Sequence, residues 1–280
     1  MLCNDRILLD DWHVVADLDH LSKGGIEKTV LFEQPITVTR SDTGVIACSD
    51  TTGPLPCQVK YGFVWICPGT PGRDIVHIPE AFDEDRYVIS GGSFGVQVSG
   101  LRVVENFLDM GHFPFVHAGW LGEEPHTEVR PYQVEVTRDD EILATECYFH
   151  QPVASPTAKG GIEVQYTYRV YRSYSVALYK TNPLFDDRMD YIVLFIQPVG
   201  PEKCVVHSML CYMKREMTRA RLRWFMQLIF AQDKPILENQ IPRRLPLDPR
   251  AETPIRADKA AIVYRRWLRE HNVHYGATVA

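Results

Sequence analysis

Four long segments of this 280-residue sequence alternate apolar and polar side chains, and they restrict the folds that it can adopt. Successive side chains of a strand point to opposite faces, so a period of two predicts half-buried β-strands. The segments cover residues 132–150, 162–181, 189–199 and 203–213. Turn residues at Asp139-Asp140 and Val199-Gly200-Pro201 suit antiparallel hairpins. We therefore predict one large, twisted antiparallel sheet.

The pattern changes after Thr218. Apolar residues then recur at helical spacing through about residue 240 and again over residues 256–270, with a proline-rich stretch between them. Helices that follow a run of strands are typical of α+β proteins. The sequence thus predicts an α+β fold in which long C-terminal helices pack on a curved antiparallel sheet.

Shorter strands are predicted before the large sheet. They cover residues 12–16, 28–32, 36–40, 44–48 and 59–67, followed by 87–89 and 94–98. The loop over residues 68–85 is rich in proline, glycine and acidic residues, which favours a boundary there. We expect a small β unit of residues 1–70 and a larger domain of residues 71–280.

Charge and cysteine content limit the class of protein. A net charge of −6 with dispersed basic residues argues against a nucleic-acid partner or an anionic membrane surface. The N-terminus lacks the basic and apolar parts of a signal peptide, and no apolar stretch is long enough to span a bilayer. Seven cysteines at irregular spacings fit reduced thiols. We expect a cytoplasmic protein without disulfides that acts on small molecules or proteins.

A short run between residues 105 and 117 carries the first candidate metal ligands. Asn106, Asp109 and His112 are three residues apart, so on a helix that begins near Leu101 they would share one face. His117 would lie about 140° further round a straight helix, and Pro114 would permit a kink that brings it back. One histidine on an apolar face is usually a packed core residue, but we interpret this cluster as a metal site, because buried polar groups are costly unless something binds them.

Asp233 is the third candidate ligand. It interrupts an apolar stripe of the helix after Thr218, formed by Leu222, Phe225, Met226, Ile229, Ile236, Leu237 and Gln240. The alternative is a frayed helix end at which Asp233 is solvated before Pro235. With His112 and His117 it would complete a two-histidine, one-carboxylate set, which suits non-haem Fe(II) that activates oxygen. Zinc accepts the same ligand types and remains the alternative metal.

These residues also carry a family resemblance. The spacing of Asn106, Asp109, His112 and His117 resembles the catalytic-iron signature of Rieske-type non-haem iron oxygenases, and residues 230–240 resemble the third-ligand helix of their monooxygenase and demethylase branch. The resemblance implies that His112, His117 and Asp233 bind a mononuclear Fe(II) that reacts with O2. It implies that Asp109 bridges an iron ligand to a neighbouring cluster and that Asn106 lies near the iron. It also implies a helix-grip (START/Bet v1-like) catalytic domain and a ring-shaped trimer.

The sequence departs from that family at the iron-sulfur cluster. Members hold a [2Fe-2S] cluster with Cys-x-His and Cys-x-x-His loops, but here the linker over residues 48–60 contains no histidine. Two Cys-x-x-His matches, Cys147 to His150 and Cys204 to His207, lie in predicted strands where residues three apart point to opposite faces, so we expect no metal there. Residues 1–70 would then be a degenerate Rieske-like β unit without its own cluster.

Electrons must in that case come from another protein. The expected partner is a Rieske-bearing reductase or a sister oxygenase subunit, fed indirectly by NAD(P)H and docked beside Asp109. Residues 100–106, 121–125 and 247–258 are similar to a Rieske-less N-demethylase branch of the family that acts in bacterial caffeine catabolism. This likeness implies oxidative N-demethylation of a planar heterocycle, a methylxanthine attacked at N7, with release of formaldehyde. It further implies a hetero-oligomer that can include a glutathione-transferase-like subunit.

Two other classes of protein remain open at this stage. A non-catalytic scaffold or ligand-binding subunit could organise a Rieske-bearing partner, and a zinc hydrolase would act without oxygen or reductant. Tyr166, Tyr168 and Tyr179 are candidate walls of a substrate pocket between the sheet and the helices, but for each of them we favour ordinary sheet packing with a partner for the hydroxyl. The iron oxygenase is the function that these residues predict.

Overall fold

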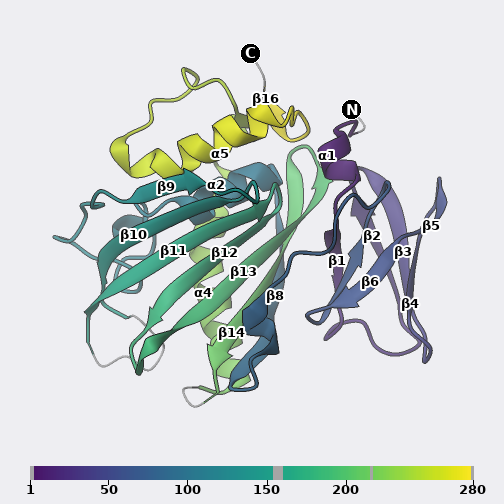
Figure 1. Cartoon of the computed structure of the whole chain (residues 1–280), viewed down its shortest axis with the longest axis horizontal. Coiled ribbons are helices and arrows are strands. Elements are labelled where there is room, and N and C mark those ends of the chain that lie inside the picture. The colour runs from purple at the N-terminus through teal and green to yellow at the C-terminus, as the bar shows by residue number, and fades with distance from the viewer. Residues whose placement is uncertain (1–2, 154–159, 215–216, 279–280) are drawn as a thin grey trace.

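The large antiparallel sheet is present in the computed structural model, which describes residues 3–153, 160–214 and 217–278. Its seven strands have the order β8-β14-β13-β12-β11-β10-β9 (Figure 1). They are β8 (Arg86–Val96), β9 (Gln133–Val136), β10 (Ile142–Gln151), β11 (Ile162–Arg172), β12 (Ser175–Asn182), β13 (Phe185–Gly200) and β14 (Lys203–Met213). The two strands predicted over residues 87–89 and 94–98 are one continuous strand, β8.

The two faces of this sheet are covered to different extents along its width. Between Val164 and Val170 of β11 the residues that face the helices are buried and the residues between them are half-exposed, whereas Tyr171 on the opposite face is buried. In β14 every residue from Val206 to Met213 is buried. A strand with polar and apolar residues buried on both faces must be covered on both sides, so a second layer has to pack behind β13 and β14.

The N-terminal residues form that second layer. They make two small antiparallel sheets, one with the order β1-β7-β6 and one with the order β2-β3-β4-β5. Their strands are β1 (His13–Asp17), β2 (Ile26–Leu31), β3 (Gln34–Arg40), β4 (Val45–Ser49), β5 (Gly53–Leu55), β6 (Cys57–Lys60) and β7 (Phe63–Ile66). The rings of Phe63 and Trp65 pack on Phe195 of β13, with centroids 5.7 and 4.6 Å away. The division of the chain near residue 70 stays a prediction.

The strand predicted over residues 59–67 is wrong as a single element. It is a hairpin of β6 and β7, because Tyr61 and Gly62 have φ angles of 57° and 84°. Two consecutive residues with positive φ make the tight turn that joins antiparallel strands. Apolar content alone therefore did not reveal this reversal of the chain.

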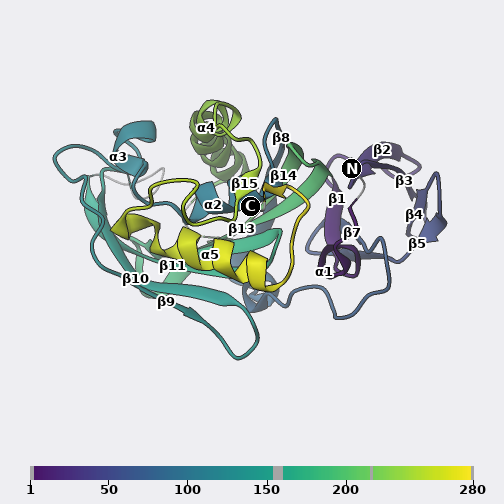
Figure 2. The same cartoon turned by 90° about the horizontal axis from the view of Figure 1, so that it is seen from above.

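Helices cover the other face of the large sheet (Figure 2). The longer ones are α2 (Gly100–Leu108), α4 (Arg219–Glu238) and α5 (Lys259–Glu270). The short elements are α1 (Arg6–Leu9), η1 (Pro79–Phe82), α3 (Phe113–Val116), β15 (Leu245–Pro246), η2 (Arg256–Asp258) and β16 (Ala277–Thr278). Ser99 caps α2 and Thr218 caps α4, each with its side-chain oxygen accepting a backbone N–H. Among the helices of the described residues, none combines the length and apolarity that crossing a membrane requires.

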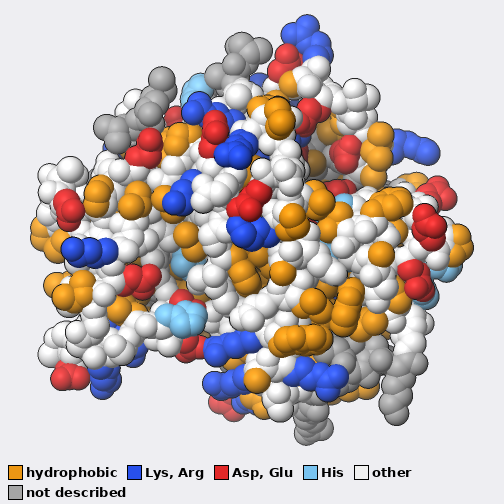
Figure 3. All heavy atoms as spheres, turned by 180° about the vertical axis from the view of Figure 1, so that it is seen from behind, with side chains coloured by type: hydrophobic (Ala, Val, Ile, Leu, Met, Phe, Trp, Pro, Cys, Tyr) orange, Lys and Arg blue, Asp and Glu red, His pale blue; other side chains and the backbone are white. Residues whose placement is uncertain are grey.

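Charged side chains of both signs are interspersed over the face opposite to Figure 1 (Figure 3). Mixing of this kind keeps the electrostatic field over a surface weak, whereas nucleic-acid binding relies on a dense basic patch. This face therefore carries charges of both signs, and the absence of a nucleic-acid partner stays a prediction.

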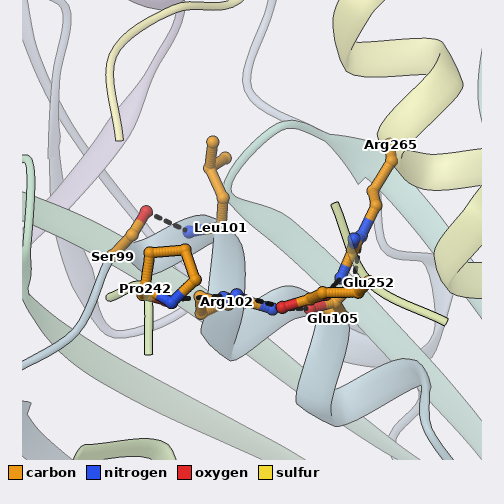
Figure 4. A network of polar contacts seen from close by, with 7 residues as sticks. All are labelled: Ser99, Leu101, Arg102, Glu105, Pro242, Glu252 and Arg265. Atoms are coloured by element: carbon orange, nitrogen blue, oxygen red, sulfur yellow. Dashed lines mark hydrogen bonds and ion pairs between the residues drawn. The ribbon is translucent and has the colours of Figure 1, made fainter. Parts of the chain in front are cut away.

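Four charged side chains fasten α2 to the C-terminal segment (Figure 4). Arg102 donates to Glu105 (2.9 Å), to Glu252 (2.7 Å) and to the carbonyl of Pro242 (3.1 Å). Arg265 donates to Glu105 (2.5 Å) and also to Glu252. Arg102 is only 3% exposed, so its charge depends on these carboxylates. The network holds α2, and with it the start of the candidate ligand run, against α5.

We expect Arg102→Met to lower the free energy of unfolding by about 1–3 kcal/mol, because Glu105 and Glu252 lose the hydrogen bonds from Arg102 and then share the charge of Arg265. Denaturant-induced unfolding would measure the change. Arg250→Met is the matched control, since Arg250 is 87% exposed and its loss should change stability by about 0.5 kcal/mol or less. Equal effects of the two substitutions would contradict the assigned role.

His207 of β14 is a buried histidine whose environment favours the neutral ring. Its ring nitrogens lie 2.8 Å from the Ser93 hydroxyl and 3.0 Å from Gln197 Oε1. Burial, with a smaller contribution from the charge of His20, lowers the pKa of His207 to about 3 from 6.5. Between these two pH values the unfolded chain binds a proton that the folded chain does not, so folding stability falls as the pH falls through this window.

We expect His207→Gln to reduce this loss of stability on acidification. The wild type should lose up to about 1.4 kcal/mol per pH unit below pH 6.5 from this residue, and the variant should lack that contribution. Urea unfolding at a series of pH values between 7 and 4 measures the difference. Parallel stability curves for the two proteins would refute the assignment.

Candidate metal centre

His112, His117 and Asp233 converge at one point beside α4, although Asp233 lies more than a hundred residues away in sequence. The two histidine Nε2 atoms are 3.2 Å apart. Asp233 Oδ1 lies 3.4 Å from His112 Nε2 and 3.1 Å from His117 Nε2. Ligand atoms that share a single ion at about 2.1 Å are roughly 3 Å from one another. The separations therefore suit a mononuclear metal site.

The backbone reaches this arrangement by a different route from the predicted kinked helix, and that prediction was wrong. Helix α2 ends at Leu108, and Asp109 is extended, with φ −82° and ψ 130°. Asp109 Oδ1 accepts the N–H of Gly111 (2.7 Å), a local bond that favours a turn over a continued helix. His112 and His117 then flank the single turn of α3, whose first turn contains Pro114. Pro114 thus begins a new helix instead of bending an old one.

Asp233 occupies a regular position within α4. The helix continues past Pro235 to Glu238, and the side chain of Asp233 is 13% exposed, so the alternative of a frayed, solvated end is wrong. Most of the predicted stripe faces inward, but Ile236 is 46% exposed and does not belong to it. The interruption of an apolar stripe by Asp233 was therefore a sound signal of a buried carboxylate.

The other ring nitrogens of both histidines have polar partners. His112 Nδ1 lies 2.9 Å from Asp109 Oδ2, and His117 Nδ1 lies 2.9 Å from Gln232 Oε1. Both partners accept, which places a proton on each Nδ1 and leaves Nε2 as the atom of each ring that would bind an ion. Asn106 Nδ2 donates to Asp233 Oδ1 (3.1 Å). Gln232 was missed by sequence reasoning, and its only signal was adjacency to Asp233.

The charges at this point attract one another strongly. Burial raises the pKa of Asp233, but hydrogen bonds from His112 and His117 outweigh it and hold this pKa well below its usual value. Burial lowers the pKa of His112, whereas Asp109 and Asp233 raise it, to about 9 in total. A proton on His112 thus supplies the positive charge that the carboxylates require. A bound metal cation would supply that charge instead and displace the proton.

A largely apolar cavity opens from these residues. It is lined by both histidines and Asp233 and, among others, by Val103, Phe107, Leu121, Tyr166, Tyr168, Leu178, Lys180, Ile192, Leu194, Leu210, Phe225, Met226, Ile229 and Phe230. Tyr166 and Tyr168 are therefore wall residues, as the sequence suggested. Tyr179 is not, because it lies on the other face of the sheet with its ring 4.4 Å from that of Tyr191.

The donor set fits iron on the chemistry of its ligands. Two imidazoles and one carboxylate would leave the remaining coordination positions of an ion facing the cavity, which is the arrangement of non-haem Fe(II) oxygenases. Within the described part of the chain, this is the one cluster of three or more such side chains close enough to hold an ion. Iron binding by His112, His117 and Asp233 stays a prediction.

Comparisons with known proteins agree on one family. Residues 96–272 match the family described as vanillate O-demethylase oxygenase C-terminal domain. A probable methylxanthine N7-demethylase, NdmC, of Pseudomonas sp. (strain TJI-51) is 44% identical over 280 residues, which is 99% of either chain. The methylxanthine N1-demethylase NdmA of Pseudomonas putida is 25% identical over 219 residues, 76% of this chain and 59% of that protein.

Solved structures show the same fold. NdmA of Pseudomonas putida CBB5 with caffeine superposes with a TM-score of 0.76 at 18% identity, covering 96% of this chain and 92% of the other. Dicamba monooxygenase bound to dicamba gives a TM-score of 0.73 at 16% identity, covering 94% and 97%. At these identities the likeness concerns the fold alone.

We expect the wild-type protein to bind about one Fe(II) per chain after anaerobic reconstitution, and His117→Ala and Asp233→Asn to lose this binding. Iron content after gel filtration is the measurement. Asp109→Ala should weaken affinity about 10- to 100-fold, since it removes the partner that orients His112. His150→Ala should bind as the wild type does, because His150 lies outside the cluster. Unchanged iron content in His117→Ala would rule the site out.

Proposed function

The chain belongs to the Rieske-type oxygenase family and is an oxidoreductase of its N-demethylating monooxygenase type, and from this premise we propose that it is a catalytic subunit that binds Fe(II) and O2 and demethylates an N-methylated planar heterocycle. The proposed substrate is a methylxanthine and the proposed position is N7. The single observation that carries the proposal is the convergence of His112, His117 and Asp233 on an apolar cavity.

The residues around this point have separable tasks. Asp109 and Gln232 hold the two imidazoles by their Nδ1 protons, and Asn106 holds the carboxylate of Asp233. Each ligand is therefore fixed before an ion binds, which is the arrangement that a reactive metal site requires. The apolar walls exclude water and leave room for a flat, weakly polar ring.

Bound iron would supply oxygen activation for hydroxylation of the N-methyl group. The overall reaction consumes the substrate, O2, two electrons and two protons, and gives the N-hydroxymethyl product and water. The C–N bond of that product then breaks, which releases formaldehyde and leaves the N–H heterocycle. The electrons have to be delivered by a donor.

We propose that this donor is a Rieske cluster on a partner protein, reduced by NAD(P)H through a reductase. Residues 44–67 contain no histidine, so they lack the imidazoles that such a cluster needs. Asp109 is the candidate docking point, because it touches His112 and its side chain is still 31% exposed. It borders a surface hollow that is lined by Glu105, Asp258, Arg265, Arg266 and Arg269, among others.

The finer assignments of fold and assembly belong to the same proposal. The helices packed on a curved sheet support a helix-grip catalytic domain over residues 71–280, and the small sheets support a degenerate Rieske-like unit over residues 1–70. A homotrimer or a hetero-oligomer with the electron donor, with or without a glutathione-transferase-like subunit, is the proposed assembly.

The competing function is a non-catalytic scaffold or ligand-binding subunit. Such a protein would keep the cavity but would have no use for a buried carboxylate that faces two oriented imidazoles. The site geometry favours the enzyme for this reason.

We expect turnover of 7-methylxanthine when the iron-loaded chain is combined with a Rieske-bearing reductase, NADH and O2. One formaldehyde should appear for each demethylated xanthine, and His117→Ala should reduce the rate at least about 10³-fold, because removal of a ligand removes the reactive ion. Formaldehyde and product are measured together by chromatography.

Three controls separate the alternatives. Activity in the absence of O2 and reductant would indicate the zinc hydrolase. No turnover with any Rieske-bearing donor, with ligand binding retained, would leave the scaffold as the better account. Faster demethylation at N1 or N3 than at N7 would change the methyl position that we propose and would leave the proposed enzyme class unchanged.

A further inference from the structure

A polar row crosses the sheet floor of the otherwise apolar cavity. Tyr166 of β11 lies directly opposite Lys180 of β12, and Lys180 lies opposite Asp190 of β13. The neighbouring row on the same face is apolar, since Leu178 pairs with Ile192 and Ile192 with Leu210. Both Tyr166 and Lys180 border the cavity that contains the three candidate metal ligands. The polar row therefore faces the same space as the metal site.

Lys180 is an unusual residue for this position. Its side chain is only 3% exposed, and a buried ammonium costs several kcal/mol unless opposite charge and hydrogen-bond acceptors surround it. Asp190, 1% exposed, lies across the strand pair and itself accepts from Asn182 (3.1 Å). A carboxylate can balance the charge of the ammonium, but an ammonium has three N–H donors. Lys180 also borders the cavity, so its ammonium can contact an acceptor there in addition to its partners within the chain.

The hydroxyls beside Lys180 give a second, independent observation. Tyr166 Oη accepts from Gln151 Nε2 (2.7 Å), so its own hydrogen is available, and the described residues provide no acceptor for it. Tyr168 Oη and Gln151 Oε1 are buried and also lack a partner among the described residues. Of these residues, Tyr166 and Tyr168 line the cavity. Buried polar groups are paired in nearly all proteins, so the unpaired hydroxyl of Tyr168 and the available hydrogen of Tyr166 indicate a ligand that supplies hydrogen bonds.

We propose that Lys180, with the hydroxyl of Tyr166, binds an oxo group of the substrate and so selects planar heterocycles that carry a ring carbonyl. The inference rests on the proposed function for the N-methyl heterocycle, and adds the feature by which that ring is chosen and oriented. A carbonyl oxygen is an acceptor without charge, which matches an ammonium and a phenol as donors. The flat ring would lie against apolar side chains such as Leu178 and Ile192.

The positions of the functional groups on a xanthine match the two ends of the cavity, which are the sheet floor with Lys180 and the candidate metal ligands. Xanthines carry their oxo groups on the six-membered ring and N7 on the five-membered ring. An oxo group held at the sheet floor would let the five-membered ring point toward His112, His117 and Asp233. Lys180 is then a specificity-determining residue that touches the substrate and not the metal.

The test compares two ligands of one shape on iron-loaded protein: 7-methylxanthine, and 7-methylpurine, which lacks both oxo groups. Isothermal titration calorimetry should show about 10- to 100-fold tighter binding of 7-methylxanthine by the wild type, the value of one charge-assisted hydrogen bond. Lys180→Met, of similar length, should abolish this preference and change 7-methylpurine binding by less than about 3-fold. Lys203→Met, an exposed lysine of the same sheet, should behave as the wild type.

Iron content and thermal midpoint serve as fold controls for each variant. If Lys180→Met fails to fold, Tyr166→Phe tests the same site, with an expected loss of about 3- to 10-fold for 7-methylxanthine alone. An equal loss for both ligands, or a wild type without preference for the oxo compound, overturns the proposal. Formaldehyde release is measured separately. If the preference for 7-methylxanthine depends on Lys180 but no formaldehyde forms, the proposed demethylase activity is refuted. If formaldehyde forms but the preference does not depend on Lys180, the proposed recognition site is refuted.

Discussion

Attraction between opposite charges at one mostly buried point organises this protein. The carboxylate of Asp233 stays anionic because two imidazoles face it. An isolated buried charge would cost several kcal/mol, so loop and helix are held at the separation that keeps these groups together. His112 and His117 come from the segment after α2, and Asp233 comes from α4. The cavity between them therefore has a polar apex, walls that are mostly apolar and a polar row on its sheet floor.

Residue spacing predicted which side chains meet, but not the path of the backbone. Residues three apart suggested one helix through His112, whereas the bond from Gly111 N–H to Asp109 favours a turn, and spacing contains no information on that competition. The bounds of β14 were predicted correctly, because turn residues precede it, but its burial on both faces departs from the half-buried strand that alternation predicted. The run over residues 59–67 also looked like one strand, and only the backbone angles of its turn reveal a hairpin.

The residues that escaped prediction have partners distant in sequence. Gln232 contacts His117 from 115 positions away. Lys180 alternates with apolar neighbours as a solvent-facing residue does, and it is buried because helices cover that face of the sheet. Tyr179 packs in the sheet against Tyr191, as the alternative of ordinary packing predicted, and does not line the cavity. A period of two separates the faces of a strand, but the layers above and below decide which face meets the cavity.

The packing of Phe63 and Trp65 on Phe195 has a consequence for how such a chain can change over generations. These rings shield the back of β13, while Ile192 and Leu194 on its front line the cavity. Loss of cluster ligands from the first seventy residues would cost little stability, because loop side chains contribute little to that shield. Deletion of residues 1–70 would expose to solvent the back of the sheet that forms the cavity floor. If residues 1–70 are a Rieske unit that has lost its cluster, as proposed, the unit is still required to keep the back of the large sheet dry.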